Sequence, residues 1–187
     1  MKKGLLIILS GPSGVGKGTV MKEFVGNSEL NLSYSISMTT RPQRDGEIEG
    51  VNYNFVTQDE FRQAIDEGKM LEYTEFVGNF YGTPLANVES LRMQGINVLL
   101  EIEVQGCMQV LSKCPDAITI FITPPSMEEL ECRIRKRATE PEETIQQRLS
   151  KAYREMEMVN QYKHIVCNDD PQLAADIITL IIKHHMK

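Results

Sequence analysis

The segment GPSGVGKGT at residues 11–19 constrains the fold of this chain more than any other stretch. It follows an apolar run, LLIIL at residues 5–9, and leads into GTVMKEFV, which has helical character. A strand, a glycine-rich loop and a helix in this order present backbone N–H groups and the positive end of a helix to phosphate. The segment therefore predicts that a nucleotide, ATP, binds at Gly11, Pro12, Ser13, Gly14, Val15, Gly16, Lys17, Gly18 and Thr19. The alternative is a glycine-rich turn that arose by chance.

The loop departs from the common pattern G-x-x-x-x-G-K-[ST] at Gly18, where a hydroxyl would reach Mg²⁺. The hydroxyl comes one residue later, at Thr19. Successive helical residues are rotated by about 100°, so Thr19 is expected to serve a phosphate instead. We expect Lys17 to neutralise the terminal phosphates, and Mg²⁺ to be held by nucleotide oxygens and water, with Glu101 or Glu103 as candidate contributors.

Four short apolar runs predict the architecture, an α/β fold with a parallel sheet flanked by helices, as in P-loop nucleotide-hydrolysing domains. The runs are LLIIL, INVLLEI from Ile96, AITIFI from Ala117 and HIVC from His164. Nearly uninterrupted apolar runs are typical of strands that are buried on both faces. Capping boxes predict helix starts at Thr57 to Glu60, Ser126 to Glu129 and Thr139 to Glu142.

The last helix is expected to start with Pro171 after Asp170. Its predicted buried stripe consists of Leu173, Ala174, Ile177, Ile178 and Ile181.

Length and charge exclude several classes of protein. The 187 residues suit one domain, and a net charge of −6 argues against a broad basic face for nucleic acid. The four cysteines form no C-x-x-C pair, so free thiols in a reducing cytoplasm are expected. The first apolar run is too short to cross a bilayer, and no cleavage site follows it. We therefore expect a cytoplasmic protein without a membrane partner, and the sequence indicates no protein partner.

The stretch from Tyr34 to about Arg92 has a different character, with short polar strands such as VNYNFV and MLEYTEFV around one helix. It predicts a small mixed unit inserted between the first two buried strands. Within it, Arg41 and Arg44 could clamp an anion, or could be solvated loop residues. Glu72 could accept two parallel hydrogen bonds from neighbouring donors such as guanine N1 and N2, or could lie on a solvated strand face. Thr83 is also a candidate N-cap before Pro84.

Two further groups of charges follow. Glu101 and Glu103 end a buried strand beside the loop strand, where open α/β sheets hold ligands. The segment 131–148 carries a basic cluster and a polar TEPEE hinge, which suit a lid that closes over phosphates. A solvated helix face is the alternative for each of these basic residues.

Taken together, these motifs closely resemble those of guanylate kinases over essentially the whole chain. The resemblance is carried by GPSGVGKG, by SxTTRxxRxGExxGxxYxF at residues 37–55, by Glu72 with GNFYGT, by RxTE near Arg137 and by IVxND before the last helix. The middle block is the specific part, since a phosphate loop occurs in many families. The resemblance implies Mg²⁺-dependent transfer of a phosphoryl group from ATP to GMP, and use of dGMP as a further acceptor.

The resemblance also implies roles for individual residues. Ser37, Glu72 and Thr83 would contact guanine, while Arg41, Arg44, Tyr53 and Tyr81 would hold the GMP phosphate. Glu101 and Glu103 would lie near the base or the metal. Arg133, Arg137 and Arg148 would be the lid and active-site arginines, and Asn168 would lie near the adenine. The catalytic set would be Lys17, Arg41, Arg137 and Arg148.

The single domain would comprise a core (1–33, 95–125 and 160–187), a GMP-binding insertion (about 34–94) and a lid (about 126–159). Ala138 stands where the family commonly has glycine, whereas G-K-G-T resembles the loop of adenylate kinases.

Three other functions are weighed against this one. A kinase for AMP or UMP is disfavoured, because the single donor amino group of adenine would leave Glu72 partly unpaired. A guanylate-kinase-like interaction module without catalysis is disfavoured by the loop lysine and the two loop arginines. An ATP-binding regulator would not need the GMP-binding residues.

Overall fold

Two sheets organise the computed structural model, which describes residues 2–76, 78–137 and 141–187. Within those residues, the first sheet has five parallel strands in the order β2-β7-β1-β8-β9. The strands are β1 (Leu6–Ser10), β2 (Leu32–Tyr34), β7 (Asn97–Glu101), β8 (Ile118–Thr123) and β9 (His164–Cys167). The predicted α/β class is confirmed, because each of the four apolar runs forms one of these strands.

The central strand β1 is buried on both faces. Ile7 and Leu9 lie in one apolar cluster together with side chains of α1 (Lys17–Phe24) and α7 (Pro171–Met186). Leu6 and Ile8 face the other way, into a second cluster that includes α3 (Leu85–Met93) and α4 (Val104–Lys113). Helices therefore cover both sides of the sheet, which explains why the run carries no polar alternation.

The edges of this sheet differ from the sequence expectation. In β9, Ile165 is 53% exposed, because β9 is an edge strand and one of its faces is not covered. At the other edge, β2 was not predicted, since its three residues LSY form no apolar run. Short edge strands are held by backbone pairing, which leaves little trace in hydrophobic periodicity.

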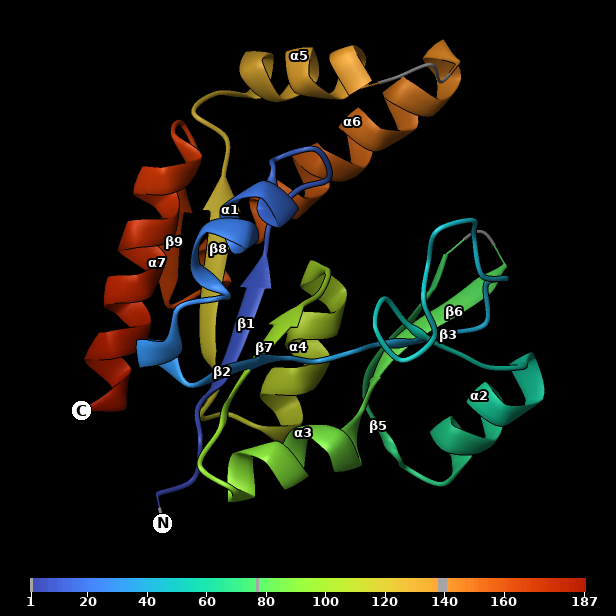
Figure 1. Cartoon of the computed structure of the whole chain (residues 1–187). Helices are drawn as coiled ribbons and strands as arrows, with labels where there is room; N and C mark the ends of the chain where they lie inside the picture. The colour runs from blue at the N-terminus through green and yellow to red at the C-terminus, as the bar shows by residue number, and fades with distance from the viewer. Residues whose placement is uncertain (1, 77, 138–140) are drawn as a thin grey trace.

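The second sheet is the small mixed unit expected between the first two buried strands. It has the order β4-β3-β6-β5 within the described residues and lies beside the larger sheet in Figure 1. Its elements are β3 (Met38–Thr39), β4 (Asn54–Phe55), α2 (Gln58–Asp66), β5 (Met70–Phe76) and β6 (Asn79–Pro84).

Two helices extend beyond the carboxyl ends of the core strands. Figure 1 shows α5 (Met127–Arg137) and α6 (Glu142–Glu157) above the arrowheads of β1 and β8. The 3₁₀ turns η1 (Ser28–Leu30) and η2 (Val159–Gln161) complete the element list for the described residues. None of the helices in the described ranges has the length and apolar character needed to cross a bilayer.

The predicted helix starts have mixed outcomes. The capping box at Thr57 is complete, and Asp170 caps α7 through the N–H of Leu173. Ser126 Oγ accepts the N–H of Glu129, but the Glu129 carboxylate bonds to Arg133 instead of closing the box. The third box was wrong in its register, because α6 begins at Glu142 with Pro141 as its N-cap. Thr139 lies outside the described residues.

The predicted stripe of α7 was only partly correct. Ala174 and Ile178 are fully buried and Ile181 packs partly against the core, but Leu173 is 59% and Ile177 is 38% exposed. Ala175 and Ile182 are buried instead. A helix with apolar residues almost all round does not reveal by periodicity which face meets the sheet.

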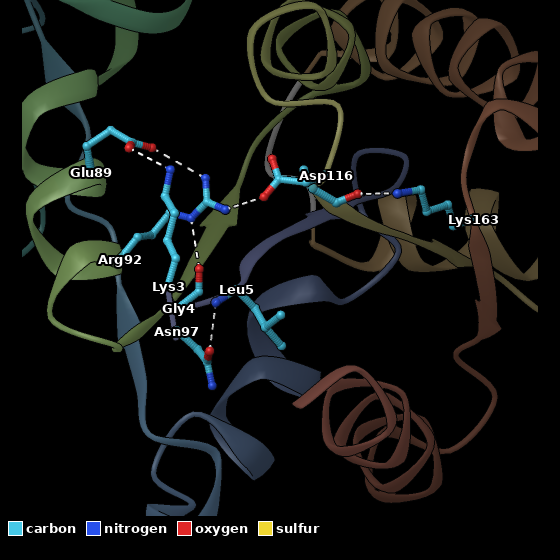
Figure 2. A network of polar contacts seen from close by, with 9 residues as sticks. Lys3, Gly4, Leu5, Glu89, Arg92, Asn97, Asp116 and Lys163 are labelled. Atoms are coloured by element: carbon cyan, nitrogen blue, oxygen red, sulfur yellow. Dashed lines mark hydrogen bonds and ion pairs between the residues drawn. The ribbon is translucent and has the colours of Figure 1, made fainter. Parts of the chain in front are cut away.

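A buried arginine joins three segments at the amino-terminal end of the sheet, as Figure 2 shows. Arg92 is 2% exposed, and its Nε donates to the carbonyl of Gly4 at 2.9 Å. Its terminal nitrogens donate to Asp116 at 2.5 Å and Glu89 at 3.3 Å. The backbone of Gly4 returns a bond to the Arg92 carbonyl. This network fixes the start of β1 against α3 and the turn before β8.

We expect Arg92→Met to lower the free energy of unfolding by about 2–4 kcal/mol, because it removes a charge-assisted network and leaves a buried carbonyl unpaired. Urea denaturation followed by circular dichroism measures this loss. The control is Arg62→Met, an exposed arginine on α2, for which a change within about 0.5 kcal/mol is expected. Equal stability of the two variants would contradict the structural role of Arg92.

Candidate active site

A cleft of about 410 Å³ lies between the two sheets at the carboxyl ends of the core strands. Its lining includes the glycine-rich loop, the insertion and α6, so segments far apart in the sequence meet there. The predicted site residues on its wall are Gly11, Ser13, Lys17, Ser37, Tyr53, Glu72, Tyr81, Glu101 and Glu103.

The loop after β1 has the geometry of a phosphate-binding loop. Gly16, the N-cap of α1, adopts a left-handed conformation with φ 97°, and a Cβ there would lie 2.7 Å from Asn168 Nδ2. Asn168 in turn donates to the carbonyl of Val15 at 2.7 Å. Glycine is therefore required at this position both by the backbone conformation and by the close approach of Asn168.

Lys17, at the start of α1, donates to the carbonyl of Gly11 at 2.7 Å. Burial lowers the pKa of this ammonium, while the nearby carboxylates Glu101, Glu155 and Glu103 act in the opposite direction. A partly buried cation with carboxylates nearby is suited to meet a polyanion, because a phosphate would neutralise its charge where few water molecules can.

Helix α6 contacts the loop through two side chains. Arg148 donates to Ser13 Oγ at 3.2 Å, and Glu155 accepts the N–H of Ser13 at 3.4 Å. Burial raises the pKa of Glu155. From α5, Arg133 donates to the carbonyl of Asn168 at 3.1 Å. Two predicted lid arginines therefore lie against the loop region, whereas the side chain of Arg137 and all of Ala138 lie outside the described part.

The second half of the loop faces outward. Gly18 and Thr19 are exposed, while Pro12 and Val15, in the first half of the loop, are buried. Among the described residues, no three or more His, Cys, Asp or Glu side chains form a group that could hold a metal ion.

The arginines predicted to bind an anion lie in the loop before β4, and neither is among the residues that line the cleft. Arg41 Nη2 lies 2.7 Å from Glu47 Oε1, and its guanidinium lies 5.6 Å from the ring centre of Tyr53. The hydrogen bond to Glu47 raises the pKa of Arg41. Arg44 approaches the same carboxylate through its backbone N–H. Tyr81 packs edge-on to Tyr53, so three of the four predicted side chains, those of Arg41, Tyr53 and Tyr81, belong to one cluster.

A buried carboxylate lies deeper in the cleft. Glu72 on β5 is 4% exposed, and Thr83 Oγ1 donates to its Oε1 at 2.6 Å. Burial raises the pKa of Glu72, and the bonds from Thr83 oppose that shift. The alternative of a solvated Glu72 was wrong. So was the N-cap role of Thr83, because Pro84 is the N-cap of α3 and Thr83 belongs to β6.

The two carboxylates at and just after the end of β7 have different surroundings. Glu101 lies on the wall of the cleft, at the end of the strand paired with β1. Glu103 is the N-cap residue of α4 and accepts from Lys151 at 2.5 Å. Glu101 is therefore the carboxylate with fewer competing partners among the two candidates.

Several residues of the site were not found from the sequence. Glu155 lies in a charged helical segment, in which its burial has no local signal. Glu47 belongs to the motif RxGE and could have been considered as a partner of Arg41. Tyr34 also lines the cleft, and burial raises its pKa.

This parallel sheet, with a glycine-rich loop after its central strand and a buried carboxylate on the wall of the same cleft, is the architecture of a P-loop phosphotransferase. The comparisons with known proteins make the class specific. A family model described as guanylate kinase matches residues 3–185. The chain belongs to the guanylate kinase family.

Individual relatives agree with this assignment. A guanylate kinase of Streptococcus agalactiae is 52% identical over 182 residues, which are 97% of this chain and 87% of the relative. One from Streptococcus pyogenes is 50% identical with coverage of 97% and 86%. The crystal structure of guanylate kinase from Anaplasma phagocytophilum superposes with a TM-score of 0.77 at 32% identity, and covers 100% of this chain and 88% of its own.

The Glu72 side chain is expected to lower the free energy of unfolding at neutral pH. Its pKa is higher in the folded protein than in the unfolded chain, so ionisation of Glu72 favours the unfolded chain. Glu72→Gln should therefore raise the free energy of unfolding of the ligand-free protein at pH 8, by about 1.4 kcal/mol for each unit of pKa difference. The gain should shrink as the pH falls towards about 4.5, because Glu72 becomes neutral in the folded protein and only about half of it stays ionised in the unfolded chain.

Thermal and urea unfolding between pH 4.5 and 8 measure this effect. Glu75→Gln, on the exposed part of the same strand, is the control and should show no such pH-dependent gain. A destabilised Glu72→Gln protein at pH 8 would contradict the reasoning.

Proposed function

We propose that this protein transfers the terminal phosphoryl group of ATP to GMP, giving ADP and GDP. The observation that carries the proposal is the buried Glu72, paired with Thr83, in the same cleft as the loop lysine Lys17. Family membership supports the same reaction.

Glu72 is the group proposed to recognise guanine. Its carboxylate can accept the N1–H and the N2–H of guanine in parallel, and Thr83 keeps it in position. Ser37 and Glu101, on the same wall, complete the proposed base site. Adenine offers neither the same pair of donors nor an N1–H, so AMP would leave a buried carboxylate unsatisfied.

The arginine cluster is the proposed site of the GMP phosphate. Arg41 is held by Glu47 and lies over the ring of Tyr53, so its planar fork is oriented before the substrate arrives. Arg44, Tyr53 and Tyr81 supply further donors. Since these contacts use only the base and the phosphate, dGMP is expected to be a substrate as well.

The loop is the proposed ATP site. Its backbone N–H groups and Lys17 would hold the phosphates, and Thr19 would serve a phosphate oxygen. Arg133 and Asn168, which contact each other and Val15, are proposed to lie near the adenine. Arg148, which lies on Ser13, and Arg137 are proposed to neutralise charge on the transferred group.

Mg²⁺ would be held in this site by nucleotide oxygens and water. Gly18 lacks a hydroxyl, and the described residues contain no group of three or more His, Cys, Asp or Glu side chains that could hold the ion alone. Glu101, or Glu103, would then hold a metal-bound water. The ion would supply neutralisation of phosphate charge.

The protein's own part in the reaction is positioning and charge stabilisation. The acceptor phosphate is already anionic, so no general base is needed. Closure of the proposed insertion (about 34–94) and lid (about 126–159) over the core would exclude water and align the two nucleotides. We place this activity in nucleotide metabolism of the cytoplasm, with ATP and GMP as partners.

A non-catalytic interaction module is the second candidate. Lys17 and the anion-binding arginines argue against it, because binding another protein requires no phosphate loop. Turnover measurements decide between the two functions.

Among the monophosphates GMP, dGMP, AMP and UMP, with ATP as donor, we expect GMP to give the highest kcat/KM. Glu72→Gln should reduce kcat/KM for GMP by at least about 100-fold, since it loses a charged acceptor for two donors. A coupled assay for ADP measures both effects. Better turnover of AMP than of GMP would overturn the proposal that GMP is the substrate. Parent-like kinetics of Glu72→Gln would mean that Glu72 is a structural residue.

Lys17→Ala should lower kcat by about 10³-fold or more, because the charge that meets the terminal phosphates is lost. GMP binding, measured by calorimetry, should change little, since the proposed GMP contacts lie elsewhere in the cleft. Lys22→Ala, on the exposed side of the same helix, is the control and should turn over normally. Near-normal turnover by Lys17→Ala would rule out the proposed ATP site.

A further inference from the structure

Helix α4 contains a buried glycine, Gly106, at its third position. Glycine is a poor helix former, and Gly106 does not have the positive φ that would require it. A helix of only ten residues gains nothing in its own stability from this choice. The reason must lie in what the helix contacts.

The contact is with the base-recognition carboxylate. A Cβ built on Gly106 would lie 2.6 Å from Glu72 Oε2 and 3.2 Å from its Cδ, and the three atoms nearest to it all belong to Glu72. The first of these distances is far shorter than two non-bonded atoms tolerate. Only glycine therefore leaves room for the carboxylate where it now lies.

Helix α4 is also prevented from moving away. The side-chain amide of Gln109 makes two hydrogen bonds with the backbone of Tyr73 on β5. It accepts the Tyr73 N–H at 3.1 Å and donates to the Tyr73 carbonyl at 2.8 Å. Lys113 donates to the carbonyls of Met70 at 2.8 Å and Leu71 at 3.0 Å. Positions 106, 109 and 113 share one face of the helix, so two anchors hold that face against β5.

The remaining sides of the helix and of the carboxylate are fixed as well. Cys107 and Val110 are fully buried in the core beneath α4. Glu72 Oε1 is held by Thr83, so the carboxyl group lies between the Thr83 hydroxyl and the helix backbone. When a methyl group is added at Gly106, the part free to move is the end of the Glu72 side chain.

We propose that Gly106 is a positioning residue for base specificity: by lacking a side chain, it lets the Glu72 carboxylate lie at the depth where it accepts both donors of guanine. The proposal rests on the guanine contact of Glu72 given above. Gly106 would thus act through Glu72 without touching the substrate, and no residue with a side chain could replace it at this position.

The test compares Gly106→Ala with the parent, using GMP and inosine 5′-monophosphate, which lacks the 2-amino group. We expect kcat/KM for GMP to fall about 10- to 100-fold and the preference for GMP over inosine monophosphate to shrink. The KM for ATP should stay within about twofold. The thermal midpoint should not fall, because alanine is the better helix former.

Gly26→Ala is the matched control, since no atom lies within 4 Å of the added Cβ, and it should behave like the parent. An unchanged preference in Gly106→Ala would overturn the proposal. So would an equal loss for both nucleotides together with a lower midpoint, which would indicate a structural role. If Glu72→Gln loses GMP selectivity while Gly106→Ala keeps it, the proposed function stands and only the inference about Gly106 fails.

Discussion

Parallel pairing of β1 with β7 and β8 is the constraint on which the rest of the site depends. The register places Leu9 opposite Glu101 and Ser10 opposite Phe121, so the segments that follow these strands emerge at one edge of the sheet. Because β1 is buried on both faces, its end cannot shift without opening the core. The phosphate loop thereby obtains a rigid base, and the carboxylates after β7 come to lie beside Lys17.

The site concentrates ionisable groups where water is scarce. Burial lowers the pKa of Lys17 and raises the pKa values of Glu72 and Glu155, so each of these groups is held against its intrinsic preference. Such an arrangement costs stability and gives strong, directional contacts to a charged substrate. The hydrogen bonds from Thr83 to Glu72 and from Ser13 to Glu155 limit that cost within the protein itself.

The small mixed sheet and the larger core sheet are joined through α4. Gln109 and Lys113 fix this core helix to β5, the strand that carries Glu72. The proposed base specificity would therefore depend on a contact between two parts of the chain that fold around different sheets. At Gly106 the helix lies so near Glu72 that no side chain fits between them. The same logic applies at Gly16, where Asn168 from the far end of the chain occupies the space of a side chain.

Local patterns in the sequence were enough to predict the α/β class, four core strands, the phosphate loop and the inserted mixed unit, because each depends on periodicity or on a short motif. The candidates Lys17, Glu72 and Tyr81 do line one cleft. Periodicity could not predict the exposure of Ile165 and Leu173, since an apolar residue does not report whether another element covers it. Only the tertiary structure placed Glu155 on the loop and Gly106 behind Glu72, because these contacts join residues far apart in the chain and leave no local signal.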